Sequence, residues 1–188
     1  NTDVTSYQLP AELSATGNRQ LATGNSYILE GFVDFTMEIS VIVARDAGGN
    51  VACYCPVENI HKNHILSETI APARIFDEVA QKAERIAYEI AHGLKLVGLI
   101  AVEMFVTKDG EILVNELAPR PHNSGHWTMD ACVTSQFEQV VRAICGLPLG
   151  NPSRLCNARM LNLIGDEVND WKKYIAEPSA KLHLYGKK

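Results

Sequence analysis

Two apolar runs joined by an Asp-Gly pair constrain the fold of this chain more than any other feature. The runs cover residues 99–106 and 112–117, and Asp109 and Gly110 lie between them. Runs rich in Val, Ile and Phe on either side of Asp-Gly predict a β-hairpin, because these side chains favour strands and this dipeptide favours a tight turn. We therefore expect an antiparallel pair of strands at the centre of the fold.

The register of this hairpin decides which side chains face each other. If the Asp-Gly pair forms a two-residue turn, Lys108 pairs with Glu111, and further out Glu103 lies directly opposite Glu116. A three-residue loop without a bulge would place Asn115 opposite Glu103 instead. Directly opposite side chains have Cβ atoms about 4.5–5.5 Å apart, and like charges there are destabilising.

Two facing carboxylates within apolar strands need a partner, and a divalent cation is the simplest one. Magnesium takes oxygen ligands and is commonly held by one or two carboxylates together with substrate phosphates. Glu103 and Glu116 are therefore candidate magnesium ligands. The alternative is that one glutamate faces solvent and the other forms a salt bridge, since a buried glutamate is rare.

The segment after the second run carries many hydrogen-bond donors. Arg120 lies between Pro119 and Pro121, and residues 122–126 read His-Asn-Ser-Gly-His. The two prolines restrict the backbone around the arginine and remove two amide donors. A planar guanidinium held in this way is suited to bind a small oxyanion through two parallel hydrogen bonds.

These residues together resemble the carboxyaminoimidazole ribonucleotide synthetases of the ATP-grasp superfamily. The most specific part of the resemblance is the run from Asn115 to Trp127, together with Glu103. The paired glutamates alone would indicate only an ATP-grasp protein. The resemblance spans about residues 26 to 165 and includes the segments 30–33, 38–41, 56–61, 135–138 and 146–150.

The resemblance implies a fold class and a domain organisation. We expect an α+β chain that contains the C-terminal half of an ATP-grasp domain, an antiparallel sheet with packed helices, and the beginning of a small C-terminal domain. Residues 1–25 match nothing, residues 26–150 form the ATP-grasp part, and residues 151–188 begin the last domain.

The resemblance also implies a reaction, in which ATP and bicarbonate carboxylate the amine of aminoimidazole ribonucleotide through carboxyphosphate, a step of purine biosynthesis. ATP and Mg²⁺ are the expected cofactors, with Glu103 and Glu116 on the metal. The bicarbonate site maps onto Arg120, His122 and Asn123. The expected nucleotide contacts are Glu30, Gly31, Phe32 and Val33 at the hinge, Glu38 on the ribose, His61, Asn115 and Glu116, and Lys187 is a candidate for the substrate phosphate.

Hydrophobic patterning predicts the remaining elements. Residues 77–95 form an amphipathic helix with Asp77 as its cap and Leu94 in its apolar stripe, and Ser135 begins another helix with capping-box spacing. Residues 58–72 show little periodicity and are expected to form a long functional loop. Further strands are expected at 26–32, 38–44, 51–57, 159–164 and 181–185, and a short helix at 166–175.

Composition excludes several classes of protein. The formal net charge is −5 and no long basic run occurs, which argues against a nucleic-acid-binding protein. No apolar run of about 18 residues predicts a membrane span, and residues 1–20 lack the pattern of a signal peptide. The five cysteines show no metal-binding spacing, so free thiols in a reducing cytoplasm are expected. The family further implies a homodimer.

The chain departs from the family upstream of the hinge. The family has a glycine-rich phosphate loop and nucleotide-binding lysines there, whereas the first lysine of this chain is Lys62. We therefore expect this polypeptide to be inactive alone. Three alternatives remain: another ATP-grasp carboxylase or ligase, a non-catalytic nucleotide-binding domain, and a zinc hydrolase that uses His122, His126, Glu103 and Glu116.

Overall fold

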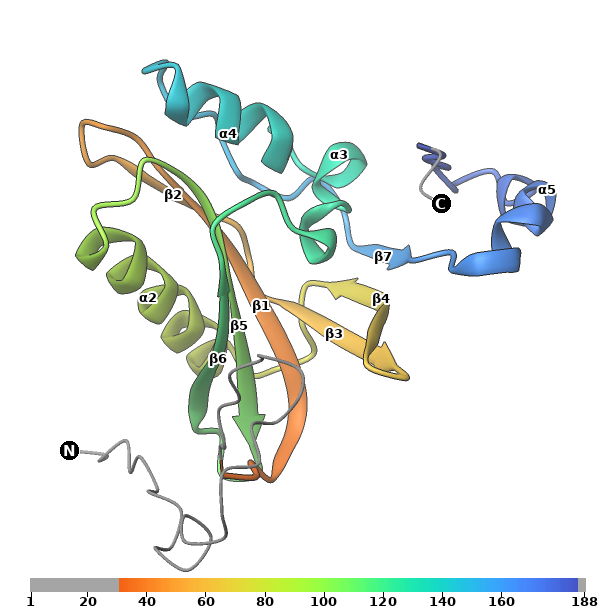
Figure 1. The fold of residues 1–188 in the computed structure, drawn as a ribbon, viewed down its shortest axis with the longest axis horizontal. Helices are drawn as coiled ribbons and strands as arrows, with labels where there is room; N and C mark the ends of the chain where they lie inside the picture. The colour runs from red at the N-terminus through yellow and green to blue at the C-terminus, as the bar shows by residue number, and fades with distance from the viewer. Residues whose placement is uncertain (1–30, 186–188) are drawn as a thin grey trace, which may run out of the picture. The chain divides into compact units, whose positions relative to one another are not determined.

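A computed structural model describes residues 31–185 of the chain. The chain divides into two units, Asn1–Val33 and Asp34–Lys188, and only residues 31–33 of the first unit are described. Residues 1–25, most of the strand expected at 26–32, Glu30 and Lys187 lie outside the described residues. The architecture below is that of the second unit (Figure 1).

A sheet of seven described strands forms the centre of this unit, and all its pairings are antiparallel. The strand order is β6-β5-β1-β3-β4-β7, and β2 pairs with β1. The strands are β1 (Phe35–Arg45), β2 (Val51–Cys53), β3 (Val57–Lys62), β4 (Ile65–Ala71), β5 (Gly98–Thr107), β6 (Ile112–Ala118) and β7 (Ala158–Leu161). The α-helices are α2 (Asp77–Gly93), α3 (Thr128–Ala131), α4 (Gln136–Ile144) and α5 (Trp171–Ile175), with 3₁₀ turns η1 (Asn123–Gly125) and η2 (Gly165–Asp170). This arrangement confirms the predicted α+β class.

Each face of the sheet supports a separate hydrophobic core, because successive strand residues point to opposite sides. Ile39, Val41 and Val43 of β1 are fully buried in the core that contains α2. The intervening residues Ile42 and Ala44 belong to the second core, with Trp127 and residues of α3. Glu38 and Ser40 continue this second face beyond the apolar part, so β1 carries polar groups to the same side of the sheet.

Helix α2 confirms the predicted amphipathic helix, with two corrections. Asp77 is the first helical residue rather than the cap, which is Phe76 and makes no side-chain cap bond. Leu94 is 60% exposed at the C-terminal cap rather than in the core. The fully buried residues are small and four positions apart, which lets the helix backbone approach the sheet closely: Ala83, Ala87 and Ala91.

The prediction of a loop over residues 58–72 was wrong, because these residues form the hairpin of β3 and β4. Two features hid it. Asn63 and His64 form its turn with φ of 51° and 63°, a left-handed conformation that the sequence signals only weakly without glycine. Asn59 and Thr69 are 5% and 0% exposed, so polar side chains occupy positions where a strand pattern requires apolar ones.

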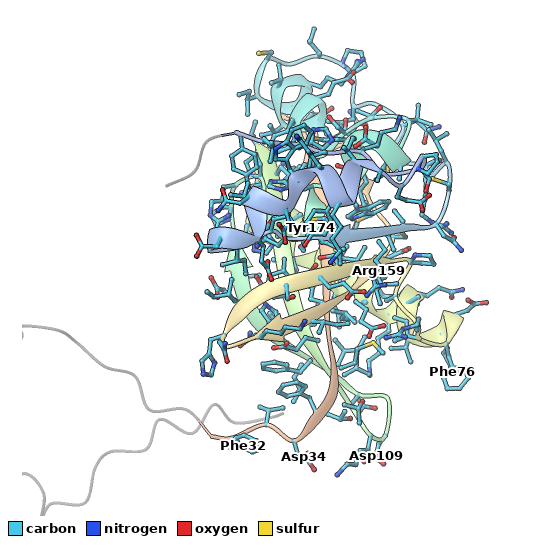
Figure 2. All side chains as sticks on the ribbon, turned by 90° about the vertical axis from the view of Figure 1, so that its right-hand side faces the viewer. Phe32, Asp34, Phe76, Asp109, Arg159 and Tyr174 are labelled. Carbon is cyan, nitrogen blue, oxygen red and sulfur yellow. The ribbon has the colours of Figure 1, made fainter. Side chains whose placement is uncertain are left out.

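The C-terminal segment joins the same sheet through β7, which pairs with β4. The strand predicted at 159–164 is found as Ala158–Leu161, and the helix predicted at 166–175 is found as η2 followed by α5. Residues 181–185 form no strand, so that prediction was wrong. Arg159 on β7 binds Glu68 on β4 through both carboxylate oxygens, with 2.7 Å between Nη2 and Oε2. Figure 2 labels Arg159 among the side chains of the described residues.

The Glu68–Arg159 pair makes the attachment of β7 sensitive to acid. The hydrogen bond from Arg159 is the largest influence on the Glu68 carboxyl and holds its pKa below the ordinary value. A depressed folded-state pKa stabilises the fold above the unfolded-state pKa, and this stability is lost as the pH falls through the folded-state value. We expect Arg159→Met to lower the free energy of unfolding at pH 7 and to change it much less at pH 3, because the Glu68 carboxyl is then closer to full protonation.

Urea unfolding of the wild-type chain and of Arg159→Met at pH 3 and pH 7 measures the effect of the substitution on the free energy of unfolding. Arg142→Met is the matched control, because it removes an exposed pair with Glu138 within one helix, which is worth a few tenths of a kcal/mol. If Arg159→Met lowers the free energy of unfolding by the same amount at pH 3 and pH 7, the proposed acid sensitivity of the Glu68–Arg159 pair is contradicted.

Candidate functional site

The turn between β5 and β6 differs from the predicted one. The Thr107 amide donates to the Glu111 carbonyl at 2.9 Å, so residues 108–110 form a three-residue loop rather than a two-residue turn. Gly110 has a φ of 76°, the left-handed conformation that the last position of such a loop requires. With this loop alone, Asn115 would lie opposite Glu103.

A β-bulge in the hairpin restores the predicted pair. Met104 pairs with Val114, whereas the preceding residue of β5, Glu103, pairs with Glu116. Asn115 is therefore the extra residue of the bulge. Glu103 and Glu116 lie directly opposite each other on neighbouring strands, as the sequence predicted, although the route to this register is different.

Glu103 is the more enclosed of the two carboxylates. Its side chain is 19% exposed, and the Nε2 atom of His122 lies 2.9 Å from its Oε1 atom. The hydrogen bond from His122 is the largest influence on the carboxyl and lowers its pKa, against the opposing effect of burial. Coulombic interactions with His122, His61 and Arg120 also lower this pKa. Glu116, on strand β6, is exposed.

His122 uses both ring nitrogens in this structure. Besides the contact of Nε2 with Glu103, its Nδ1 atom lies 2.8 Å from the Ser124 hydroxyl and 3.3 Å from the Ser124 amide. The predicted bicarbonate ligand is therefore held against the acidic pair.

The segment around Arg120 turns tightly and leaves its guanidinium exposed. The Arg120 amide donates to the Ala118 carbonyl at 2.8 Å, and Nη1 donates to the Pro121 carbonyl at 3.1 Å. Among residues 31–185, no carboxylate forms a salt bridge with Arg120. Asn123 begins η1, and its Oδ1 atom is buried without a hydrogen-bond partner in the part of the chain that is described.

The structure brings together two of the predicted nucleotide contacts. The Nδ1 atom of His61 on β3 lies 2.5 Å from Oε2 of Glu38 on β1, and each side chain is 27% exposed. Glu38 and Ser40 face the same side of β1, and Ser40 pairs with Glu103 on β5. The Glu38–His61 pair therefore lies on the same face of the sheet as the acidic pair. Gly31, Phe32 and Val33 belong to the first unit.

Sequence reasoning missed a buried glutamine that holds the His122 backbone. The side-chain amide of Gln136 accepts from the His122 amide at 2.9 Å and donates to the His122 carbonyl at 2.7 Å. Gln136 is fully buried at the first turn of α4. Ser135 caps this helix as predicted, since its hydroxyl accepts from the Glu138 amide at 3.2 Å. The capping-box spacing placed Gln136 on the helix but did not indicate its partner.

The zinc alternative lacks its ligand set. His126 packs against Phe137 and Tyr185, with ring centroids 5.5 and 6.3 Å apart. Burial lowers the His126 pKa. Over residues 31–185, no three His, Cys, Asp or Glu side chains are grouped closely enough to bind a metal ion.

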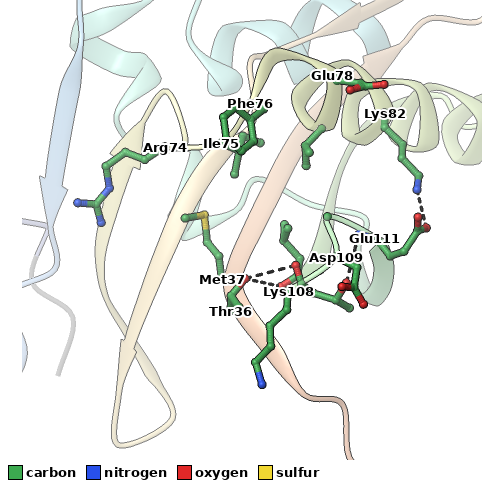
Figure 3. A pocket seen from close by; sticks show the side chains of 14 residues that line it. Thr36, Met37, Arg74, Ile75, Phe76, Glu78, Lys82, Lys108, Asp109 and Glu111 are labelled. Carbon is green, nitrogen blue, oxygen red and sulfur yellow. Dashed lines mark hydrogen bonds and ion pairs between the residues drawn. The ribbon is translucent and has the colours of Figure 1, made fainter.

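A hollow in the described structure lies away from these residues. It has a volume of about 600 Å³ and is bordered by β1, the start of α2 and the β5–β6 loop (Figure 3). Its lining includes Met37 and Val79, which pack in the core of the α2 face. Lys82 and Glu111 form a salt bridge of 2.7 Å at its edge. None of the predicted site residues lines it, so the functional-site assignment depends on the acidic pair and not on this hollow.

Comparison with known proteins identifies the family of the chain. Residues 7–137, more than half of the sequence, match the ATP-grasp domain. The chain belongs to the ATP-grasp family. Residues 158–188 of this ATP-grasp chain also match the phosphoribosylaminoimidazole carboxylase C-terminal domain.

Individual relatives point to one branch of the ATP-grasp family. N5-carboxyaminoimidazole ribonucleotide synthase of Bacillus subtilis is 54% identical over 165 residues, which cover 85% of this chain and 42% of that protein. A crystal structure of an N5-carboxyaminoimidazole ribonucleotide synthetase with ADP has a TM-score of 0.79 and 52% identity, covering 84% of this chain and 42% of that one. The Aspergillus clavatus enzyme with ADP and aminoimidazole ribonucleotide has a TM-score of 0.78 and 35% identity, covering 82% and 43%. These comparisons confirm the predicted ATP-grasp fold, and the chain spans less than half the length of these relatives.

Proposed function

We propose that this chain supplies the metal- and anion-binding part of an N5-carboxyaminoimidazole ribonucleotide synthase. The observation that carries the proposal is the pairing of Glu103 with Glu116, beside His122 and the exposed Arg120. Similarity to N5-carboxyaminoimidazole ribonucleotide synthases supports the choice of reaction. In this reaction ATP and bicarbonate convert aminoimidazole ribonucleotide to its N-carboxy form, with ADP and phosphate as products.

The donor set of the acidic pair fits Mg²⁺ rather than a softer metal. Two carboxylates on adjacent strands supply hard oxygen ligands and leave other coordination positions for water and for the phosphates of ATP. Bound there, Mg²⁺ would neutralise charge on the β- and γ-phosphates, which is its general role in phosphoryl transfer. Glu103 and Glu116 would hold the ion, and Asn115 would be a neutral neighbour.

The remaining residues would position the reactants. The Arg120 guanidinium can hold bicarbonate through two hydrogen bonds while the bicarbonate receives the γ-phosphoryl group of ATP. His122 and Asn123 would lie beside the anion. Glu38, when ionised, accepts hydrogen bonds and can bind the ribose hydroxyls, and His61 fixes its orientation. Carboxyphosphate is short-lived in water, so the site must be shielded during transfer.

The rest of the assignment follows the same family comparison. We infer that residues 26–150 belong to the ATP-grasp domain, with residues 30–33 as the adenine-binding hinge, and that residues 151–188 begin a small C-terminal domain in which Lys187 contacts the substrate phosphate. The five cysteine thiols are free, which is compatible with the cytoplasm. No helix of the described chain has the length and apolar character needed to cross a bilayer. A homodimer is the expected assembly.

The proposal predicts nucleotide binding without turnover for this 188-residue chain. Lysines that would cover the phosphates are missing before Lys62, so we expect Mg-ATP to bind while ADP release with bicarbonate and aminoimidazole ribonucleotide stays at background. Calorimetry with ATP, with and without Mg²⁺, measures the binding, and a coupled assay measures ADP. Binding that is insensitive to Mg²⁺, or absent, would refute the site assignment. Robust turnover would refute the expected inactivity.

A further inference from the structure

A chain of buried hydrogen bonds runs beneath the candidate site and ends at Glu103. Its members come from four strands, β1, β3, β4 and β5, and from the loop after β6. Thr69 contacts Asn59 at 3.1 Å, Asn59 contacts Ser40 at 2.9 Å, and Ser40 contacts Ser124 at 2.8 Å. Ser124 then contacts His122, which contacts Glu103 as described above. Thr69, Ser40 and Ser124 are fully buried, so water cannot replace these partners.

The backbone amide of Ser124 fixes the direction of the whole chain. An amide can only donate, so its contact with Nδ1 makes that nitrogen an acceptor and leaves the ring proton on Nε2. The Ser124 hydroxyl must then also donate to Nδ1, and its oxygen is left to accept from Ser40. Ser40 in turn accepts from the Asn59 amide group, whose oxygen accepts from Thr69.

We infer that Thr69, Asn59, Ser40 and Ser124 are positioning residues that hold His122 as its Nε2–H tautomer, with that proton directed at Glu103. Every donor in the chain points toward the carboxylate, and aligned hydrogen bonds in a buried site polarise one another. The chain therefore supplies Glu103 with a hydrogen-bond donor of fixed orientation. This inference deepens the proposed function, because it explains how the enclosed acid of the pair is oriented.

The tautomer can be measured without nucleotide or metal, so its failure is distinguishable from that of the proposed function. The probe is ¹⁵N-histidine-labelled 188-residue chain at about pH 8.5, two units above the ordinary histidine pKa. Loss of signals in His122→Gln assigns the ring. We expect one tautomer with a pyridine-like Nδ1 and a pyrrole-like Nε2. A protonated Nδ1, or averaged signals, in the wild-type chain would overturn the inference.

Variants test whether the remote residues act through His122. Ser40→Ala breaks the chain at its centre, and we expect roughly a tenfold rise in the population of the Nδ1–H form, as loss of one ordinary hydrogen bond would give. Thr69→Val should shift the signals in the same direction, and Thr69→Ser should restore them. Val43→Ala, a buried change on the opposite face of β1, should lower stability without moving the His122 signals. Wild-type signals in Ser40→Ala would overturn the inference.

Discussion

Gly125→Ala is expected to lower the free energy of unfolding by about 2–4 kcal/mol, the sum of overpacking and of broken buried hydrogen bonds. A Cβ atom at this position would lie 2.5 Å from Oε1 and 2.7 Å from Cδ of Gln136. Gln136 cannot retreat without cost, because it is fully buried and its amide bonds both backbone groups of His122. Urea unfolding monitored by tryptophan fluorescence measures the loss.

A matched glycine provides the control for Gly125→Ala. Gly93 ends helix α2 and would place a Cβ in open space, so Gly93→Ala should be neutral or stabilising by up to about 1 kcal/mol. In a Gln136→Ala background, Gly125→Ala should cost little more, because the clash and the two bonds are already gone. Additive losses in the double variant would show that the Gly125–Gln136 contact is not the cause.

Glu116→Gln is expected to have opposite effects in the absence and presence of Mg-ATP. Without ligand, the change removes one of two facing carboxylates, so stability should rise by about 0.2–1 kcal/mol. With Mg-ATP at about 100 times its dissociation constant, the wild-type chain should gain about 2.7 kcal/mol. Glu116→Gln should lose most of that gain, because one of the two magnesium ligands is missing. Thermal or urea unfolding of the wild-type chain and of Glu116→Gln, each with and without Mg-ATP, measures these stabilities.

Glu111→Gln is the control for this charge change. Glu111 lies at the end of the hairpin loop, is exposed and pairs with Lys82, so the variant should lose at most about 1 kcal/mol and keep the full Mg-ATP gain. A Glu116→Gln chain that is stabilised by Mg-ATP as strongly as the wild type would refute the metal assignment.

The sequence predicted the hairpin and its acidic pair because local signals specify both. Strand-forming runs around Asp109 and Gly110 indicate the hairpin, and the family resemblance independently marks Glu103 and Glu116. The predicted turn type was wrong, however, because the loop has three residues rather than two. No local pattern shows that Asn115 is the extra residue of a bulge. The register came out right because the third loop residue and the bulge residue compensate each other.

The residues beneath the site could not be predicted from local patterns. Asn59 and Thr69 are polar and buried, so they interrupt the alternation that identifies strands, and the β3–β4 hairpin was interpreted as a loop. Gln136 contacts a loop 14 residues upstream, a contact that neither helical periodicity nor capping signals contain. Sequence patterns indicate which side chains are buried in the apolar core, whereas the positions of these polar residues depend on tertiary hydrogen bonds.

The bulge at Asn115 divides the β5–β6 hairpin into parts that respond differently to changes in length. Residues between the paired Thr107 and Glu111 do not affect the register, so a relative could lengthen or shorten the 108–110 loop and keep its two acids opposite each other. A residue inserted between Glu111 and Val114, or between Glu103 and Thr107, would instead turn one acid to the other side of the sheet. Length changes among active homologues should therefore be concentrated in the loop and at the bulge.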